Sequence, residues 1–189
     1  VDYIYELRNC YIGYATRGCP NGCEFCAVHR IEPVFNGYLP LRRQIQLIEE
    51  LYGEKPDLIL LDNNVLASER FKDIIKDIKS LGFGKGATYT YKNKAGRATT
   101  VSRYIDFNQG LDSRLLTEEK MELLSEIAIR PIRIAFDHIG LRSLYEEKVR
   151  LAARYGLKYL SNYILYNFHD RPNEFYERLK INLDLNEEI

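Results

Sequence analysis

The chain has 189 residues, of which 46% are hydrophobic and 29% charged, a composition typical of a globular protein with one sizeable core. Its 27 basic and 27 acidic residues cancel to a formal net charge of +0, so the chain as a whole has no electrostatic attraction to nucleic acid or to an anionic membrane. No apolar run approaches the ~20 residues that a membrane-spanning helix needs, and the first residues carry no signal-peptide pattern, so we expect a cytoplasmic protein without a membrane partner.

Segments with the pattern of strands alternate with segments of helical period along the chain. Residues 58–62 are almost continuously apolar, which is typical of a strand buried on both faces. The expected strands are 12–16, 58–62, 104–108, 132–137 and 159–166. The expected helices are 41–52, 68–81, a helix capped by Thr117, 141–155 and 172–185. This alternation predicts a parallel sheet with right-handed crossovers, and it places function on the loops at the C-terminal ends of the strands.

Residues 83–103 interrupt the alternation. Two β-prone runs flank a turn-like segment at 93–96, which predicts an inserted β-hairpin over 87–102. The segment contains no acidic residue and five basic ones: Lys85, Lys92, Lys94, Arg97 and Arg103. These are either ordinary lysines and arginines of a solvated hairpin, or a flap over the site or a phosphate contact. Tyr89 and Tyr91 lie among them and leave nucleic acid open as a partner.

Three of the four cysteines lie within eight residues, at Cys19, Cys23 and Cys26, with the spacing C-x3-C-x2-C. Cysteine thiolates hold iron–sulfur clusters, normally four to a cluster. A four-iron cluster held by three thiolates has one iron without a protein ligand, and that iron can bind a small molecule. The spacing therefore predicts a cluster that takes part in chemistry and does not only store electrons.

This motif, with the aromatic Phe25 before its last cysteine, resembles the signature of the radical S-adenosylmethionine (SAM) superfamily. Residues 11–33, YIGYATRGCPNGCEFCAVHRIEP, are similar to the cluster loop of members that often carry a cobalamin-binding-type domain upstream. The resemblance implies a [4Fe–4S] cluster whose open iron chelates SAM. An electron from a reductant such as flavodoxin or ferredoxin would cleave SAM to a 5′-deoxyadenosyl radical, which would act on an unknown substrate.

The resemblance also implies a fold. Superfamily members have a partial (β/α)6-type TIM barrel, and residues 1–189 would form one radical SAM core domain of that kind. Five βα units are visible, with the hairpin as an insertion. The chain begins with Val1 and not with Met, so we expect a fragment or a processed form.

By the same resemblance, SAM contacts are expected at the strand ends. Arg114 suits a carboxylate such as that of methionine, and Asp112 can accept hydrogen bonds from ribose hydroxyls. Asp62 occupies the position of a glycine-rich acidic motif, whose glycines this chain lacks. Most of the candidates also have an ordinary structural interpretation: a turn for Asp62 and Asn63, a surface ion pair for Asp112 and Arg114, a helix cap for Asp137 and a core aromatic for Phe25. The candidates are Phe25, Asp62, Asn63, Gln109, Asp112, Arg114, Asp137, Ile164 and Asn167.

Two alternative sets of metal ligands stay open. Cys19, Cys23 and Cys26 could form a zinc knuckle with His29, or Cys10 could complete a set of four cysteines. No second pair of metal ligands follows downstream, and Cys10 precedes the first strand, so we expect a buried Cys10 that binds no metal.

The alternative functions are a cobalamin-dependent radical SAM methyltransferase, with its cobalamin domain upstream of Val1, and a non-catalytic module that binds zinc or nucleic acid.

Overall fold

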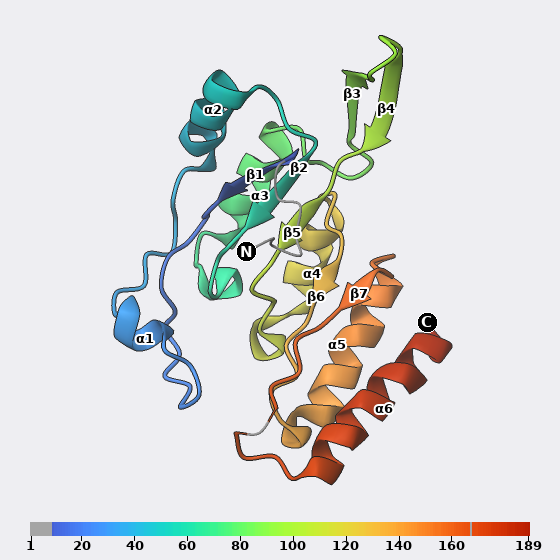
Figure 1. The fold of residues 1–189 in the computed structure, drawn as a ribbon. Coiled ribbons are helices and arrows are strands. Elements are labelled where there is room, and N and C mark those ends of the chain that lie inside the picture. The colour runs from blue at the N-terminus through green and yellow to red at the C-terminus, as the bar shows by residue number, and fades with distance from the viewer. Residues whose placement is uncertain (1–8, 167) are drawn as a thin grey trace.

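The structure is a computed structural model that describes residues 9–166 and 168–189. Its central sheet has three parallel strands in the order β1 (Cys10–Gly13), β2 (Asp57–Leu60) and β5 (Ile105–Phe107) (Figure 1). Tyr11 lies opposite Leu58, which in turn lies opposite Ile105, and all three side chains are buried. The strands therefore bring one continuous apolar face to the core.

A second, two-stranded parallel sheet has strands that run in the same direction as those of the central sheet. It consists of β6 (Ile132–Arg133) and β7 (Leu160–Ser161). Isolated parallel bridges join Ile105 to Ile129 and Leu111 to Ile134, so the segment around β6 runs beside β5. The C-terminal ends of all five parallel strands consequently point to the same end of the molecule.

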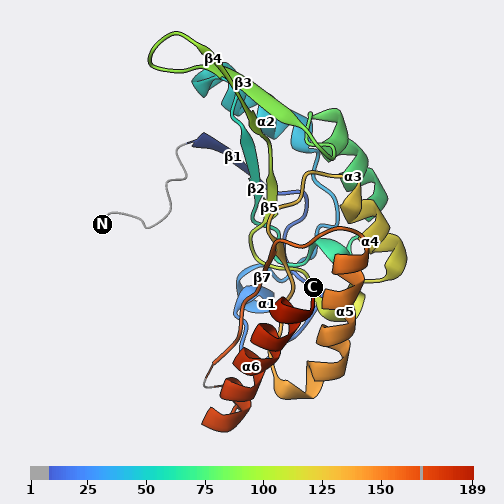
Figure 2. The same ribbon diagram turned by 90° about the vertical axis from the view of Figure 1, so that its right-hand side faces the viewer.

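Helices fill the connections between these strands. Figure 2 shows α3, α4 and α5 stacked along one face of the strands, and α6 beside α5. The buried face of α3 carries Phe71, Ile74, Ile75 and Ile78, at the spacing of an amphipathic helix. No helix in the described part of the chain is both long enough and apolar enough to cross a bilayer. The helices are α1 (Val28–Ile31), α2 (Leu41–Tyr52), α3 (Phe71–Ser80), α4 (Glu118–Ser125), α5 (Arg142–Arg154) and α6 (Pro172–Glu188).

The predicted partial (β/α)6-type TIM barrel is wrong. The strands are short and belong to three small sheets: the three-stranded parallel sheet, the antiparallel β3–β4 pair and the parallel β6–β7 pair. The β6–β7 ladder weakens after two residues, because the next bonds, from the Ile134 and Phe136 amides, are 3.3 and 3.4 Å long. Alternating βα units predict parallel neighbours, but closure into a barrel depends on strand tilt and stagger, which local sequence does not specify.

The expected hairpin is present, with β3 (Thr88–Lys92) antiparallel to β4 (Ala98–Ser102). It projects from the end of the molecule away from α1 (Figures 1 and 2). Arg103, directly after β4, fixes its base by donating hydrogen bonds to the carbonyls of Pro56 and Lys55 at 3.0 and 2.8 Å. The same guanidinium packs over the ring of Phe83 at 4.2 Å. The hairpin therefore lies far from the loops at the C-terminal ends of the strands and is not a flap over them.

Candidate functional site

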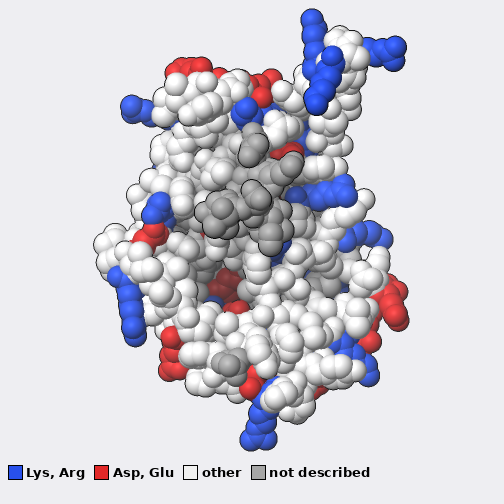
Figure 3. Space-filling view, viewed as in Figure 1, with Lys and Arg blue, Asp and Glu red and all other residues white. Residues whose placement is uncertain are grey.

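A cavity of about 460 Å³ lies at the C-terminal ends of the parallel strands, and we call it the strand-end cavity. Its walls come from the loops after β1, β5, β6 and β7 and from the start of α6. Figure 3 shows a hollow with acidic side chains inside it on this face of the molecule. The volume is within the range of pockets that bind small molecules. Among its lining residues are Cys23, Phe25, Arg114, Asp137, His138 and Phe168.

The three clustered cysteines lie on residues 14–27, the cysteine loop, between β1 and α1. None of them is in a disulfide, and all are partly exposed. The Cys26 amide donates to the Cys23 carbonyl at 3.0 Å, a turn that holds these two residues close together. Cys23 reaches the strand-end cavity, and Phe25 beside it packs edge-on against Phe168 with ring centroids 5.7 Å apart.

Cys19 receives polar contacts from two sides. Its sulfur accepts from the Asn21 amide at 3.5 Å and from the Asn64 side chain at 3.7 Å. Hydrogen bonds of this kind to sulfur tune the potential of iron–sulfur clusters. Asn64 is 3% exposed, and its side-chain oxygen has no hydrogen-bond partner among the described residues.

The first end of the cysteine loop is fastened by Glu32. Its carboxylate pairs with Arg17 and accepts from the Gly18 amide at 2.8 Å and from the Asn63 side chain at 3.2 Å. Gly18 has a φ of 74°, and a Cβ there would stand 2.6 Å from the Val34 carbonyl oxygen. Only glycine fits this approach, so the geometry of the backbone just before Cys19 is fixed by sequence.

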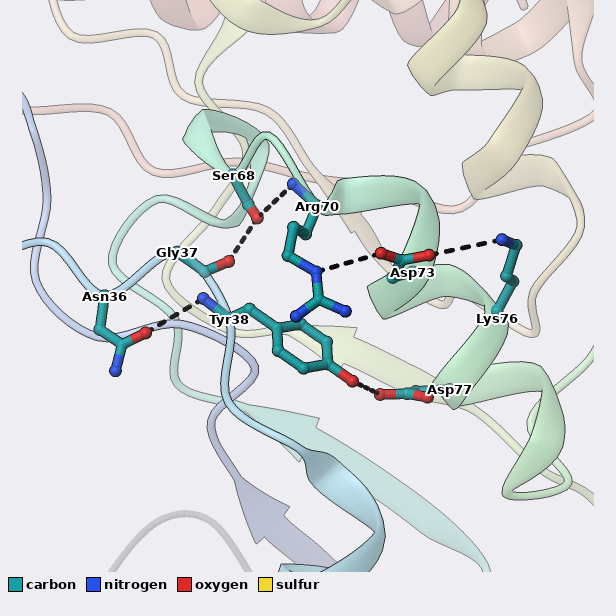
Figure 4. Close-up of polar contacts among 8 residues, drawn as sticks. All are labelled: Asn36, Gly37, Tyr38, Ser68, Arg70, Asp73, Lys76 and Asp77. Atoms are coloured by element: carbon teal, nitrogen blue, oxygen red, sulfur yellow. Dashed lines mark hydrogen bonds and ion pairs between the residues drawn. The ribbon is translucent and has the colours of Figure 1, made fainter.

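The chain that returns from the cysteine loop is fastened to α3 (Figure 4). The Tyr38 hydroxyl donates to Asp77 at 2.7 Å, and the Arg70 guanidinium stacks over the Tyr38 ring at 3.7 Å. Ser68 donates to the Gly37 carbonyl and accepts from the Arg70 amide. The chain is thus held just before Cys19 and again after α1, while the segment between these points, with the thiols, is partly exposed.

Asp112 and Arg114 follow β5 and lie beside the cysteine loop. Arg114 donates from two nitrogens to the two carboxylate oxygens of Asp112, at 2.8 Å each. Burial raises the pKa of Asp112, but the hydrogen bonds and charge of Arg114, together with the hydrogen bond from Asn21, outweigh it and hold the pKa below its ordinary value. The pairing raises the pKa of Arg114, and a smaller contribution comes from the Cys23 thiol. Arg114 therefore stays charged between a carboxylate and a cysteine at the cavity wall.

Asp137 and His138 follow β6 and also line the strand-end cavity. Burial raises the pKa of Asp137 above its ordinary value. Behind them lies Arg178 of α6, which is fully buried and donates to the carbonyls of Phe136 and Leu165 at 2.5 and 2.6 Å. Arg178 also pairs with Asp170. One side chain thus ties together the loops after β6 and β7.

Four of the residues expected to contact a cofactor lie at or beside the strand-end cavity: Phe25, Asp112, Arg114 and Asp137. Asn63 instead bonds Glu32, as described above. Gln109 is exposed, and Ile164 is half-buried, and neither lines the cavity. Asn167 lies outside the described residues.

Asp62 lies 2% exposed at the end of β2, away from the lining of the strand-end cavity. One carboxylate oxygen accepts from the Thr16 hydroxyl at 2.7 Å and from the Thr16 amide. Its other oxygen has no hydrogen-bond partner within residues 9–166 and 168–189. Burial raises the pKa of Asp62 to about 6. In this structure Asp62 joins the chain after β1 to the chain after β2.

Sequence reasoning missed Arg178. A signal was present, because Arg178 precedes Ile181 and Leu185 by three and seven residues and so shares the buried face of α6. A lone arginine on an apolar helix face indicates a buried cation with carbonyl or carboxylate partners. Asn64 could not be predicted, because nothing in the local sequence shows which of the three consecutive polar residues 62–64 contacts the Cys19 sulfur.

The donor chemistry of the cysteine loop suits an iron–sulfur cluster, since it offers thiols, N–H groups directed at sulfur and an arginine beside Cys23. The arrangement is not preformed. In the part of the chain that the structure describes, no three His, Cys, Asp or Glu side chains are gathered closely enough to hold a metal ion. Binding would therefore have to draw the three thiols together.

No family model matches the chain, and a search of curated proteins finds no relative.

Proposed function

We propose that the chain is a radical SAM enzyme, with Cys19, Cys23 and Cys26 as the ligands of a [4Fe–4S] cluster and the strand-end cavity as the place for SAM. One observation carries the proposal: the loop with the three clustered thiols opens onto a cavity of about 460 Å³, with Cys23 and Phe25 in its wall. When bound and reduced, the cluster supplies the electron that cleaves SAM to methionine and a 5′-deoxyadenosyl radical.

The polar groups of the cavity suit the two ends of SAM. Arg114 has five N–H donors and uses two of them on Asp112, which leaves donors for the Cys23 sulfur and for a ligand carboxylate. The edge-on pair of Phe25 and Phe168 offers an apolar wall for an adenine ring. Asp137, half-buried in the lining of the same cavity, is an acceptor for ribose hydroxyls.

The remaining lining restricts water and holds the walls in place. Ile139, Leu141 and Leu165 contribute apolar surface, and Arg178 fixes the carbonyl of Leu165 from behind. A reactive radical needs such shielding more than it needs an acid–base pair. The electron would come from a small redox protein such as flavodoxin or ferredoxin.

The test is SAM cleavage under anaerobic conditions. Protein reconstituted with iron and sulfide is reduced with dithionite in the presence of SAM, and 5′-deoxyadenosine and methionine are quantified. We expect both products in equal amounts from the native chain, and neither from a Cys19→Ala, Cys23→Ala, Cys26→Ala triple variant. A native chain that holds a full cluster and releases no 5′-deoxyadenosine would refute the proposal.

One observation favours a second candidate, a zinc site. The Nδ1 atom of His29 is buried without a hydrogen-bond partner among the described residues, and His29 follows Cys26 by three residues. Three thiolates and this imidazole would form a tetrahedral zinc knuckle. One zinc ion per chain with no sulfide, lost in a His29→Ala variant, would favour zinc. Retention of iron and sulfide in His29→Ala would favour the cluster.

A further inference from the structure

The β3–β4 hairpin projects from the body of the protein (Figures 1 and 2). It extends from the end of the molecule away from α1, and its tip is rich in basic side chains (Figures 1 and 3). Because it does not border the strand-end cavity, the proposed function gives it no role.

The charges of the hairpin and of the segment that leads into it, residues 82–103, are unbalanced. Residues 82–103 hold five cations and no acid in a chain whose formal net charge is +0, so the local excess does not follow from overall composition. Arg103 pairs with Glu54 at 3.0 Å. The other four cations form no ion pair with any described residue: Lys85, Lys92, Lys94 and Arg97. All four are exposed, so their charge faces solvent.

Two aromatic rings lie on the same ribbon. Tyr89 and Tyr91 are two residues apart on β3 and therefore on one face, with ring centroids 5.9 Å apart and planes within 15°. The Tyr89 hydroxyl donates to the Glu54 carbonyl at 3.2 Å, which fixes the inner ring against the body of the protein. Tyr91 stacks on the outer side and is 41% exposed. Its ring is an accessible aromatic platform on a positively charged arm.

The arm is also preorganised. Beyond the anchoring of Arg103, the side chain of Asn93 closes the turn by accepting from the Ala95 and Arg97 amides at 3.0 and 3.1 Å. Thr90 and Thr100 share a hydrogen bond of 2.8 Å across the strands. Little conformational entropy would therefore be lost when a ligand binds along it.

We propose that the β3–β4 hairpin binds single-stranded nucleic acid. The four unpaired cations contact backbone phosphates, and an unpaired base stacks on Tyr91. Phosphates account for the excess of cations, and the exposed ring favours a single strand because the bases of a duplex are already stacked on one another. RNA and DNA strands share the phosphates and the bases on which these contacts depend, so both are expected to bind.

Fluorescence anisotropy with labelled single-stranded 12-mers of RNA and DNA tests this on the full chain. If all four cations contact phosphates, the logarithm of affinity should fall with the logarithm of salt concentration with a slope of about −2.8. In the variant Lys92→Ala, Lys94→Ala, Arg97→Ala the slope should shrink to about −0.7. A charge-matched control, Arg43→Ala, Lys72→Ala, Lys180→Ala, removes three exposed cations elsewhere and should leave both affinity and slope unchanged.

The stacking contribution is tested separately. Tyr91→Ala should weaken binding about 5- to 150-fold without changing the salt slope, whereas Tyr91→Phe should bind like the native chain. Circular dichroism checks that each variant is folded. The proposal is overturned if the hairpin triple variant binds as tightly as the native chain, if a duplex of the same sequence binds more tightly than either strand, or if vesicles with anionic lipids bind and no oligonucleotide does.

Discussion

Arg114 holds Asp112 by two parallel hydrogen bonds of 2.8 Å, and this pair is the point where the loop after β5 meets the cysteine loop. The same carboxylate accepts from the side chains of Asn21 at 3.0 Å and Asn64 at 3.4 Å. Asn64 also contacts the sulfur of Cys19. The position of the cysteine loop therefore depends on a charged group that lies outside it.

Removal of this carboxylate should loosen the site. Asp112→Ala leaves Arg114, Asn21 and Asn64 without their shared acceptor, and we expect it to lower the free energy of unfolding by about 1–3 kcal/mol. Asp112→Asn keeps one acceptor oxygen, so its free energy of unfolding should fall clearly less than that of Asp112→Ala. Urea unfolding at pH 7 measures both. Equal stability of Asp112→Ala and the native chain would show that the contacts contribute nothing to the fold.

Asp62 should make stability depend on pH. Burial raises its pKa from 3.8 to about 6, so the folded state binds the proton more tightly than the unfolded chain does. The resulting stabilisation is complete below pH 3.8 and is lost as the pH rises through 6. Asp62→Asn stays neutral throughout. Relative to this variant, the free energy of unfolding of the native chain should fall by on the order of 3 kcal/mol as the pH rises over this window.

Asp62→Asn is a suitable comparison because an amide oxygen can still accept from Thr16. Denaturant titrations of both proteins at intervals between pH 4 and 7 measure the difference. Parallel stability curves across that range would mean that the folded-state pKa of Asp62 is not raised.

Arg178 should be far more important to stability than an exposed arginine nearby. Arg178→Ala leaves Asp170 as a buried carboxylate without its partner and frees two buried carbonyls, which typically costs about 3–5 kcal/mol. Arg150→Ala, on α5, breaks partly exposed pairs with Glu146 and with Glu188 of α6, and it should cost less than about 1 kcal/mol. Thermal and urea unfolding of the two variants provide the comparison, and similar losses would contradict this account of Arg178.

The hairpin should be dispensable for the fold. The Arg103 amide donates to the Ala87 carbonyl at 2.9 Å, so a two-residue Gly-Gly turn can replace residues 88–102. We expect this deletion to change the free energy of unfolding by about 0.5 kcal/mol or less and to leave iron content intact. Arg103→Ala, which removes the buried anchor, should cost about 1–3 kcal/mol. Loss of iron on deletion would show that the hairpin supports the site after all.

Helices were easier to predict from the sequence than strands, for a physical reason. The helix expected at 41–52 is observed at Leu41–Tyr52, since its apolar period is local to the segment. The strand expected at 12–16 is observed at Cys10–Gly13, because its extent is set by pairing with β2, where Cys10 lies opposite Asp57. The expected barrel failed for the same reason, since pairing between distant segments determines sheet closure.

The site was predictable only in part. The rule that function gathers at strand ends located Arg114 and Asp137, which do line the cavity. The same rule selected Asp62, but its carboxylate is hydrogen-bonded to Thr16 and does not line the cavity. Strand-end position thus identifies candidates, and only tertiary packing decides which of them face a cavity.

Iron and acid-labile sulfide content after anaerobic reconstitution shows directly whether Cys19, Cys23 and Cys26 bind an iron–sulfur cluster. We expect about four irons per chain. Cys19→Ala, Cys23→Ala and Cys26→Ala should each lose the iron. Cys10→Ala should retain it, because Cys10 begins β1 and lies at the opposite end of that strand from the cysteine loop. Stoichiometric zinc without sulfide, or loss of iron in Cys10→Ala, would contradict a three-cysteine cluster with an open iron.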